Sequence, residues 1–146
     1  MSVQFSIRGL SQLKIKFANA AAKARPVMQA DLMKFGQLVM NDAKERYVPV
    51  DEGTLQDSGK VEADVSPFSG ATVGVRLSFG GAASAYAIAI HELPNYNPPS
   101  WGNRTNLNWT KAGTGAKYLE LPVMAHSKDL PNVAAKVWVH LWTGVV

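Results

Sequence analysis

The chain lacks cysteine and any long apolar run, and both absences narrow what it can be. Without cysteine there is no disulfide, no thiolate nucleophile and no cysteine metal ligand. No stretch of about 18 apolar residues occurs, so we expect no transmembrane helix and no membrane partner. The N-terminus has no basic region followed by an apolar stretch and a small-residue cleavage site, so we expect no signal peptide and synthesis in a cytoplasm.

Residues that perform chemistry are also few and poorly arranged. The three histidines, His91, His126 and His140, do not have the HExxH spacing of a zinc site. His91 and Glu92 are adjacent, and adjacent side chains on a strand point to opposite faces, so we expect a structural role for both. The glycine pairs match neither a P-loop nor a dinucleotide-binding motif. The sequence therefore predicts no enzymatic activity, no cofactor and no metal.

The net charge of +4 is distributed unevenly along 146 residues, a length that predicts one domain spanning 1–146. Residues 1–50 carry a balance of +5, residues 51–70 carry −4, and the remainder carries +3. A basic segment beside an acidic turn favours head-to-tail contact between copies, since complementary patches steer association. The alternative is that these are ordinary solvated faces. The basic residues are spread out, which does not indicate a phosphate-binding stripe.

A long helix is predicted from residue 11 to about 47, where good helix formers dominate and only Pro26 interrupts. Proline removes a backbone donor, so we expect a kink there or two helices in sequence. A stripe at helical spacing predicts the face that packs on the core: Met28, Leu32, Phe35 and Val39. Met33 and Met40 lie on another face and are candidates for a subunit contact.

Pro49 ends this helix, and Asp51 to Thr54 predict a tight turn that includes Gly53. We expect Asp51 and Ser58 to bond to nearby backbone amides and fix this turn.

Alternating apolar residues predict strands, because side chains of a strand point to opposite faces in turn. Residues 61–65 and 73–79 alternate in this way and are joined by a short connection, which predicts an antiparallel hairpin. Residues 3–7 predict a further strand. Residues 86–90 alternate with alanines and indicate a third strand of the sheet, with a helical turn as the alternative.

Residues 93–114 show neither a helical nor a strand period, and a loop of this length is most often functional. Its Trp101 and Trp109 predict a docking arm, since buried aromatic residues dominate interface energetics. The alternative is that both side chains fold back onto the chain's own sheet.

The C-terminal third predicts helix from near Lys117, with a second start at residues 129–131. Apolar side chains cover an arc of about 240° of the last helix, which is too wide for one core contact. Contact with other subunits is therefore expected for Trp138, Val139 and Trp142. A strand over residues 137–142 is the rival interpretation, because β-forming residues are frequent there.

Three strings occur in order along the chain: VPVDEGTLQDSG at 48–59, YAIAIHE at 86–92 and GAKYLELP at 115–122. Together they resemble the HK97 gp10-like family of phage head-tail joining proteins, over roughly residues 25–125. The fold that we expect is α+β: a long N-terminal helix packed across a small antiparallel sheet, with a C-terminal helical segment.

The resemblance implies a virion structural protein in the neck of a tailed phage, made in the bacterial host cytoplasm. Members are expected to form a ring of roughly six or twelve copies around the DNA channel, each interface joining unlike patches. The implied partners are further copies of the chain, the portal or adaptor and the tail proteins. Genome DNA would pass through the channel without sequence-specific binding.

Three other interpretations remain open. One is a nucleic-acid-binding module that uses Lys14, Lys16, Lys23 and Arg25. Another is a hydrolase that uses His91 and Glu92, and the third is a tail terminator or minor capsid component.

Overall fold

A computed structural model describes residues 10–50, 52–64, 73–94 and 113–143. The helices are α1 (Leu10–Asp42), α2 (Thr54–Asp57), α3 (Ser84–Glu92), α4 (Glu120–Ser127) and α5 (Leu130–Thr143), and the strands are β1 (Lys60–Asp64) and β2 (Gly74–Ser78). A π-helical turn (Ala43–Tyr47) extends α1, and a 3-10 turn (Gly81–Ala83) precedes α3. The predicted α+β class is confirmed: a long N-terminal helix, a small antiparallel sheet and C-terminal helices are all present. The expected strand at residues 3–7 lies outside the described residues.

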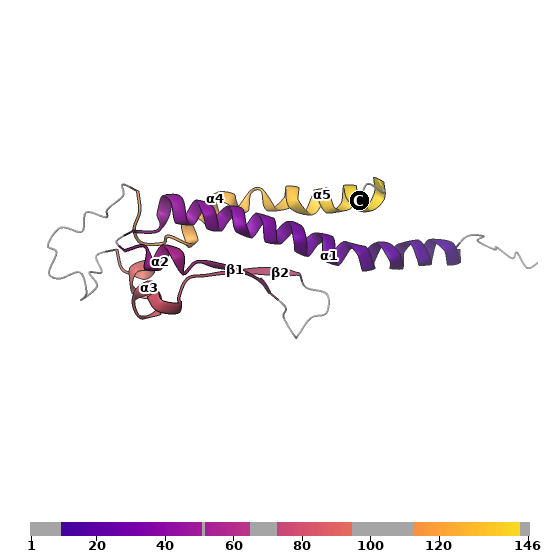
Figure 1. Cartoon of the computed structure of the whole chain (residues 1–146). Coiled ribbons are helices and arrows are strands. Elements are labelled where there is room, and N and C mark those ends of the chain that lie inside the picture. Colours follow the sequence, from indigo (N-terminus) through magenta and orange to yellow (C-terminus); the bar gives the residue numbers. More distant parts are fainter. Residues whose placement is uncertain (1–9, 51, 65–72, 95–112, 144–146) are drawn as a thin grey trace, which may run out of the picture.

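Helix α1 is the longest element, and the other described elements lie along it or at its C-terminal end (Figure 1). The β1–β2 hairpin lies along one side of it and α5 along another, while α2 and α3 gather at its C-terminal end. The helix runs through Pro26 without interruption, so the alternative of two separate helices is wrong.

The hairpin packs closely on α1 because Gly36 has no side chain. A β-carbon at Gly36 would lie 2.8 Å from Cγ1 of Val75 and 3.0 Å from Cγ1 of Val61. The predicted antiparallel pairing is confirmed, with Val61 opposite Leu77 in the register. About two helical turns before Gly36, the Gln29 side-chain amide donates to the carbonyl of Gly74 at 3.0 Å. One face of the hairpin is thereby fixed on the helix.

The hairpin also explains why the prediction that Met40 contacts another subunit is wrong. This side chain is only 1% exposed. It follows Gly36 by one helical turn on the same face, and its sulfur lies near Gly59, which precedes β1. Met33 is half-buried. The second apolar face of α1 exists, but the chain's own hairpin covers much of it.

Residues 86–90 form part of α3, so the third strand of the sheet is wrong and its helical alternative is confirmed. Tyr118 donates its hydroxyl hydrogen bond to the carbonyl of Ala87 at 2.8 Å. Its ring also meets the ring of Phe79 edge-on, with centroids 5.2 Å apart. Contacts from distant residues thus hold α3 against the core.

The C-terminal residues are helical as expected, and the strand interpretation of residues 137–142 is wrong. Helix α5 begins at Leu130, within the predicted second start. Val137 is 1% exposed and packs in the core. The region between Lys117 and Glu120 is a turn, so the first helix of this part starts slightly later than predicted.

The expected tight turn after α1 is present at Gly53, whose φ of 84° lies in the left-handed region that favours glycine. Pro49 is buried where the helix ends, and Asp51 lies outside the described residues. Ser58 fixes the turn in a different way from the one predicted: its hydroxyl donates to the nearby carbonyl of Leu55 at 2.7 Å, and the amide from which it accepts, at 3.2 Å, belongs to the distant Gly80.

Candidate functional site

The three strings of the sequence that resemble head-tail joining proteins meet in one cluster. Val48 and Leu55 come from the first string, Ala87 and Ile90 from the second, and Tyr118 from the third, and all five are buried together. Backbone hydrogen bonds join the same segments. The amide of Gly115 donates to the carbonyl of Tyr47 at 3.1 Å.

A further bond runs from the amide of Lys117 to the carbonyl of His91 at 2.8 Å. Lys117 has a φ of 60°, which is uncommon for a residue with a side chain. These strings therefore specify a core and its turns.

A polar network lies on the surface of this cluster. Nδ1 of His91 lies 2.8 Å from Oε1 of Glu92, so the expectation that these side chains point apart is wrong. The expectation assumed a strand, whereas on α3 both groups reach the same solvent edge. Nζ of Lys117 lies 2.7 Å from Oε2 of Glu92 and 3.1 Å from Oε2 of Glu120.

The electrostatics of this network favour a structural ion pair. The hydrogen bond from Lys117, followed by that from His91, lowers the pKa of Glu92. The hydrogen bonds to Glu92 and Glu120 raise the pKa of Lys117. A general base works best with a pKa near the working pH, and here both charged states are stabilised instead. Nε2 of His91 is buried and has no hydrogen-bond partner in the part of the chain that the structure describes.

A second network joins α1 to the end of α4. Nε2 of His126 lies 3.0 Å from Oδ2 of Asp42, and the same carboxylate pairs with Arg46. On the other edge of the ring, Nδ1 of His126 lies 3.8 Å from Oδ2 of Asp129. Asp42 is buried, so these partners replace the water that its carboxylate loses.

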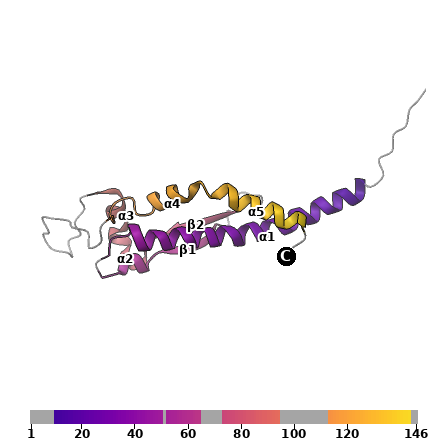
Figure 2. The same ribbon diagram turned by 90° about the horizontal axis from the view of Figure 1, so that it is seen from above.

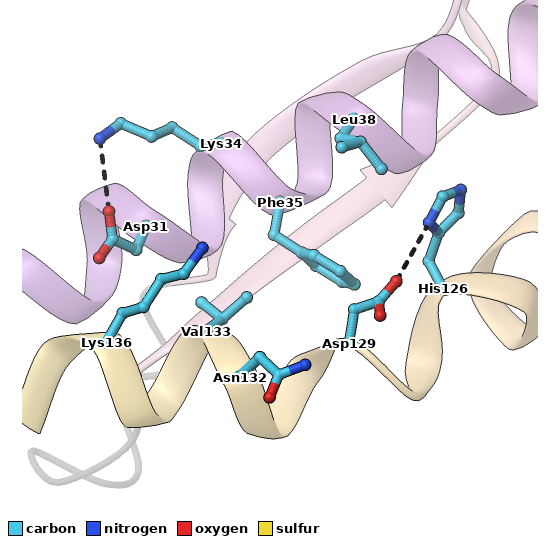
Figure 3. Close-up of a pocket in the computed structure, with 9 residues that line it drawn as sticks. All are labelled: Asp31, Lys34, Phe35, Leu38, His126, Asp129, Asn132, Val133 and Lys136. Carbon is cyan, nitrogen blue, oxygen red and sulfur yellow. Dashed lines mark hydrogen bonds and ion pairs between the residues drawn. The ribbon is translucent and has the colours of Figure 1, made fainter.

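Between α1 and α5 lies a groove with a volume of about 470 Å³ (Figure 3). Phe35 and Val133 point toward one another across it, and Lys34 and Lys136 stand at one end with His126 and Asp129 at the other. Its lining is Asp31, Lys34, Phe35, Leu38, His126, Asp129, Asn132, Val133 and Lys136. This set holds no serine, threonine or tyrosine, so the histidine and aspartates have no hydroxyl nucleophile to activate.

Among the described residues, no group of three or more His, Asp or Glu side chains could hold a metal ion. In the same part of the chain, no helix is long and apolar enough to cross a membrane.

Exposed apolar side chains form the most prominent feature of the surface. On α5, Trp138 is 59% exposed and Val139 is 57% exposed. Other large apolar side chains of the last two helices are also exposed: Leu121, Val123, Met124 and Leu130. We call these six residues the α4–α5 apolar surface. Large apolar side chains exposed on two successive helices are candidates for contact with a partner.

The residues predicted to contact other subunits therefore differ in their exposure. Trp138 and Val139 are exposed as expected, and Met40 is buried. Trp101 and Trp109 lie outside the described residues, and Trp142 belongs to α5 but its side chain is not described. The sequence analysis missed the α4 part of the apolar surface. Its signal was present in the apolar residues on both sides of Pro122.

Comparison of the chain with models of known protein families, with curated proteins and with solved structures finds no match.

Proposed function

We propose that this chain is a structural protein of a tailed-phage virion, located in the neck as part of a ring that joins the portal to the tail around the DNA channel. It acts through shape and contact surfaces, without catalysis. Its partners are further copies of itself, the portal or adaptor and the tail proteins.

The observation that carries the proposal is the convergence of the three strings on one core. Val48, Ala87 and Tyr118 come from different strings and are buried in the same cluster. Strings that match a family by order and spacing here also supply most of one core and the backbone hydrogen bonds around it, so they are linked in the fold as well as in the sequence. The α+β arrangement agrees with the fold that the resemblance implies.

The exposed surfaces support a role in assembly. Trp138 and Val139 are more than half exposed, whereas the preceding residue of the same helix, Val137, is buried. Tryptophan is frequent among residues that dominate binding energy in interfaces. The carboxylates of Glu92 and Asp42 are held in ion pairs with Lys117 and His126, which supports a structural protein over a hydrolase.

A contact with DNA phosphates is the second candidate function, favoured by the exposed Lys14, Lys16 and Lys23 on α1. It predicts binding that weakens steeply with salt, because phosphate contacts release counterions. A gel-shift experiment at low and at high salt tests it directly. Lack of binding to duplex DNA at low salt would exclude it.

The neck proposal is tested by mixing the purified chain with the portal of the same phage and imaging the product by negative-stain electron microscopy. We expect added density on the portal ring, and we expect the chain in purified virions by mass spectrometry. The variant Trp138→Gln should lose this attachment. Ala135→Gln is the matched control, because Ala135 is an exposed residue of the same helix. Absence of the chain from virions would contradict the proposal.

A further inference from the structure

The two ends of the molecule are formed by different elements. At one end, the N-terminal turns of α1 extend beyond α5 and the hairpin, and Figures 1 and 2 agree on this. At the other end, α2 and α3 lie together beside the C-terminal turns of α1. The molecule is therefore elongated, and a surface at one end can reach another copy without interference from the body.

The protruding end of α1 is basic and carries apolar side chains. All side chains of residues 14–19 are exposed, and Ile15 is 60% exposed. Phe17 is also exposed. Lys14, Lys16 and Lys23 lie on the same segment, and no acidic residue occurs from residue 10 to residue 30. A helix in water gains most of its stability from packing, so this segment has much to gain from a covering surface.

The opposite end is acidic and also carries apolar side chains. Glu52 and Asp57 flank α2 and are exposed, and neither makes an ion pair within the described ranges. Residues 51–59 contain no Lys or Arg, and the nearest cations are Lys60, which follows directly, and Lys44, whose side chain lies beside Gly59. On α3, Ile88 is 75% exposed, and Leu93 just after it is also exposed. Both ends thus combine unsatisfied charge with exposed apolar area, and their charges are of opposite sign.

From this polarity we infer that the N-terminal end of α1 in one copy docks on the α2–α3 end of the next copy. The inference rests on the proposed function, in which copies of the chain form a ring. Lysines of the first end would pair with Glu52 and Asp57, and Ile15 and Phe17 would cover the apolar area around Ile88. Opposite charges steer the two ends together and fix the register of the contact.

The same charges decide against two other arrangements. Two protruding ends cannot pair symmetrically with each other, because each brings only positive charge. DNA would satisfy the lysines, but its phosphates would leave the exposed Ile15 uncovered. A contact between unlike ends is heterologous, and repeating it closes a ring or extends a filament.

Sedimentation velocity of the full chain tests the inference with two sets of neutral substitutions. Lys14→Gln, Lys16→Gln and Lys23→Gln together disable the basic end, and Glu52→Gln with Asp57→Asn disables the acidic end. Wild type should form oligomers that dissociate as salt rises, because a shorter screening length weakens exposed charge pairs. Each variant alone should associate at least roughly tenfold more weakly.

Mixing the two variants gives the sharpest outcome. Each retains one intact end, and the two intact ends are complementary. The mixture should therefore stop at a dimer of one copy of each variant, whereas wild type continues to larger oligomers. Lys34→Gln, Lys128→Gln and Lys136→Gln together form the matched control, since they remove the same charge from elsewhere. Circular dichroism checks that every variant keeps its helix content.

Any of four results would overturn the inference. The first is sedimentation of wild type as a monomer at every salt concentration, and the second is association of both variants at the wild-type level. A loss of association in the lysine variant alone, together with wild-type association that depends on added duplex DNA, would assign the basic end to DNA. If the variants still form rings on the portal, this inference fails and the neck function stands. If wild type assembles through these ends but is absent from virions, the neck function fails and the inference stands.

Discussion

Nε2 of His126 and Oδ2 of Asp42 lie 3.0 Å apart and are separated by 84 residues in the sequence. The contact ties the end of α4 to the end of α1. Asp42 is only 8% exposed and also pairs with Arg46, so its carboxylate is the centre of a partly buried network.

Asp42→Asn should lower the free energy of unfolding by about 1–3 kcal/mol, because His126 and Arg46 lose their anionic partner in a partly buried place. Urea denaturation measures this loss. Asp31→Asn is the matched control: Asp31 pairs with the exposed Lys34, and this change should cost less than about 1 kcal/mol. Equal losses in the two variants would show that the Asp42 network contributes no more than a surface ion pair.

Gly36→Ala should destabilise the protein by about 1–3 kcal/mol, because the added methyl group overlaps Val75 and Val61. In an exposed helix the same change would stabilise by about 1 kcal/mol, so the sign of the effect reports the close packing of α1 on the hairpin. The thermal unfolding midpoint measures it. Adding Val75→Ala should restore part of the loss, since it vacates the space that the new methyl group needs.

Stability should fall at alkaline pH because of Tyr118. Burial, followed by the nearby Tyr86, raises the pKa of Tyr118 to about 12 from its ordinary 10.0. A group whose pKa is higher in the folded than in the unfolded protein stabilises the fold fully at pH values below the unfolded pKa. This stabilisation is lost as the pH rises through the folded pKa. This contribution is therefore lost as the pH rises from about 10 toward 12, up to roughly 2–3 kcal/mol.

Tyr118→Phe isolates this effect from other groups that titrate in the same range, including Lys117. At about pH 8 the variant should be less stable by about 1 kcal/mol, because the hydrogen bond to Ala87 is lost. Between about pH 10 and 11 it should lose less stability than wild type. Urea denaturation at both pH values measures the difference. Parallel losses would contradict the assignment to Tyr118.

Substitutions at two neighbouring residues of α5 should change the free energy of unfolding by different amounts. Val137→Ala should cost about 1–3 kcal/mol, because Val137 is buried against α1. Trp138→Gln should change the free energy of unfolding by less than about 1 kcal/mol, because Trp138 is exposed. Urea denaturation of the monomer compares them. A large loss for Trp138→Gln would mean that its ring packs within the chain and is not available to a partner.

The local sequence pattern was sufficient to predict the hairpin and the long helices, but it did not decide between strand and helix for residues 86–90. The strands around Val61 and Val75 have an unambiguous period of two, with polar residues between the apolar ones. In α3 the alternating positions are alanines, which fit either a strand or a helix. The hydrogen bond from Tyr118 to Ala87 helps to hold the helix, and it comes from a residue 31 positions away that no local pattern includes.

Met40 illustrates a second limit of sequence patterns. Its position relative to the Phe35 stripe correctly indicates a different face of the helix. Whether that face is covered depends on Gly36, which lets the hairpin approach, and on Gly59, beside which the Met40 sulfur lies. The His126–Asp42 contact could not be predicted either, because it depends on how α4 returns to α1.

The position of α1 between the hairpin and α5 has a consequence during synthesis (Figure 1). Ribosomes add about 5–20 residues per second, so roughly 5–20 s pass between completion of α1 and emergence of α5. Throughout that interval the Phe35 side of the nascent helix has no cover from its own chain. A chaperone that binds the nascent chain would therefore have its longest access to the Phe35 side of α1, before α5 is synthesised and covers it.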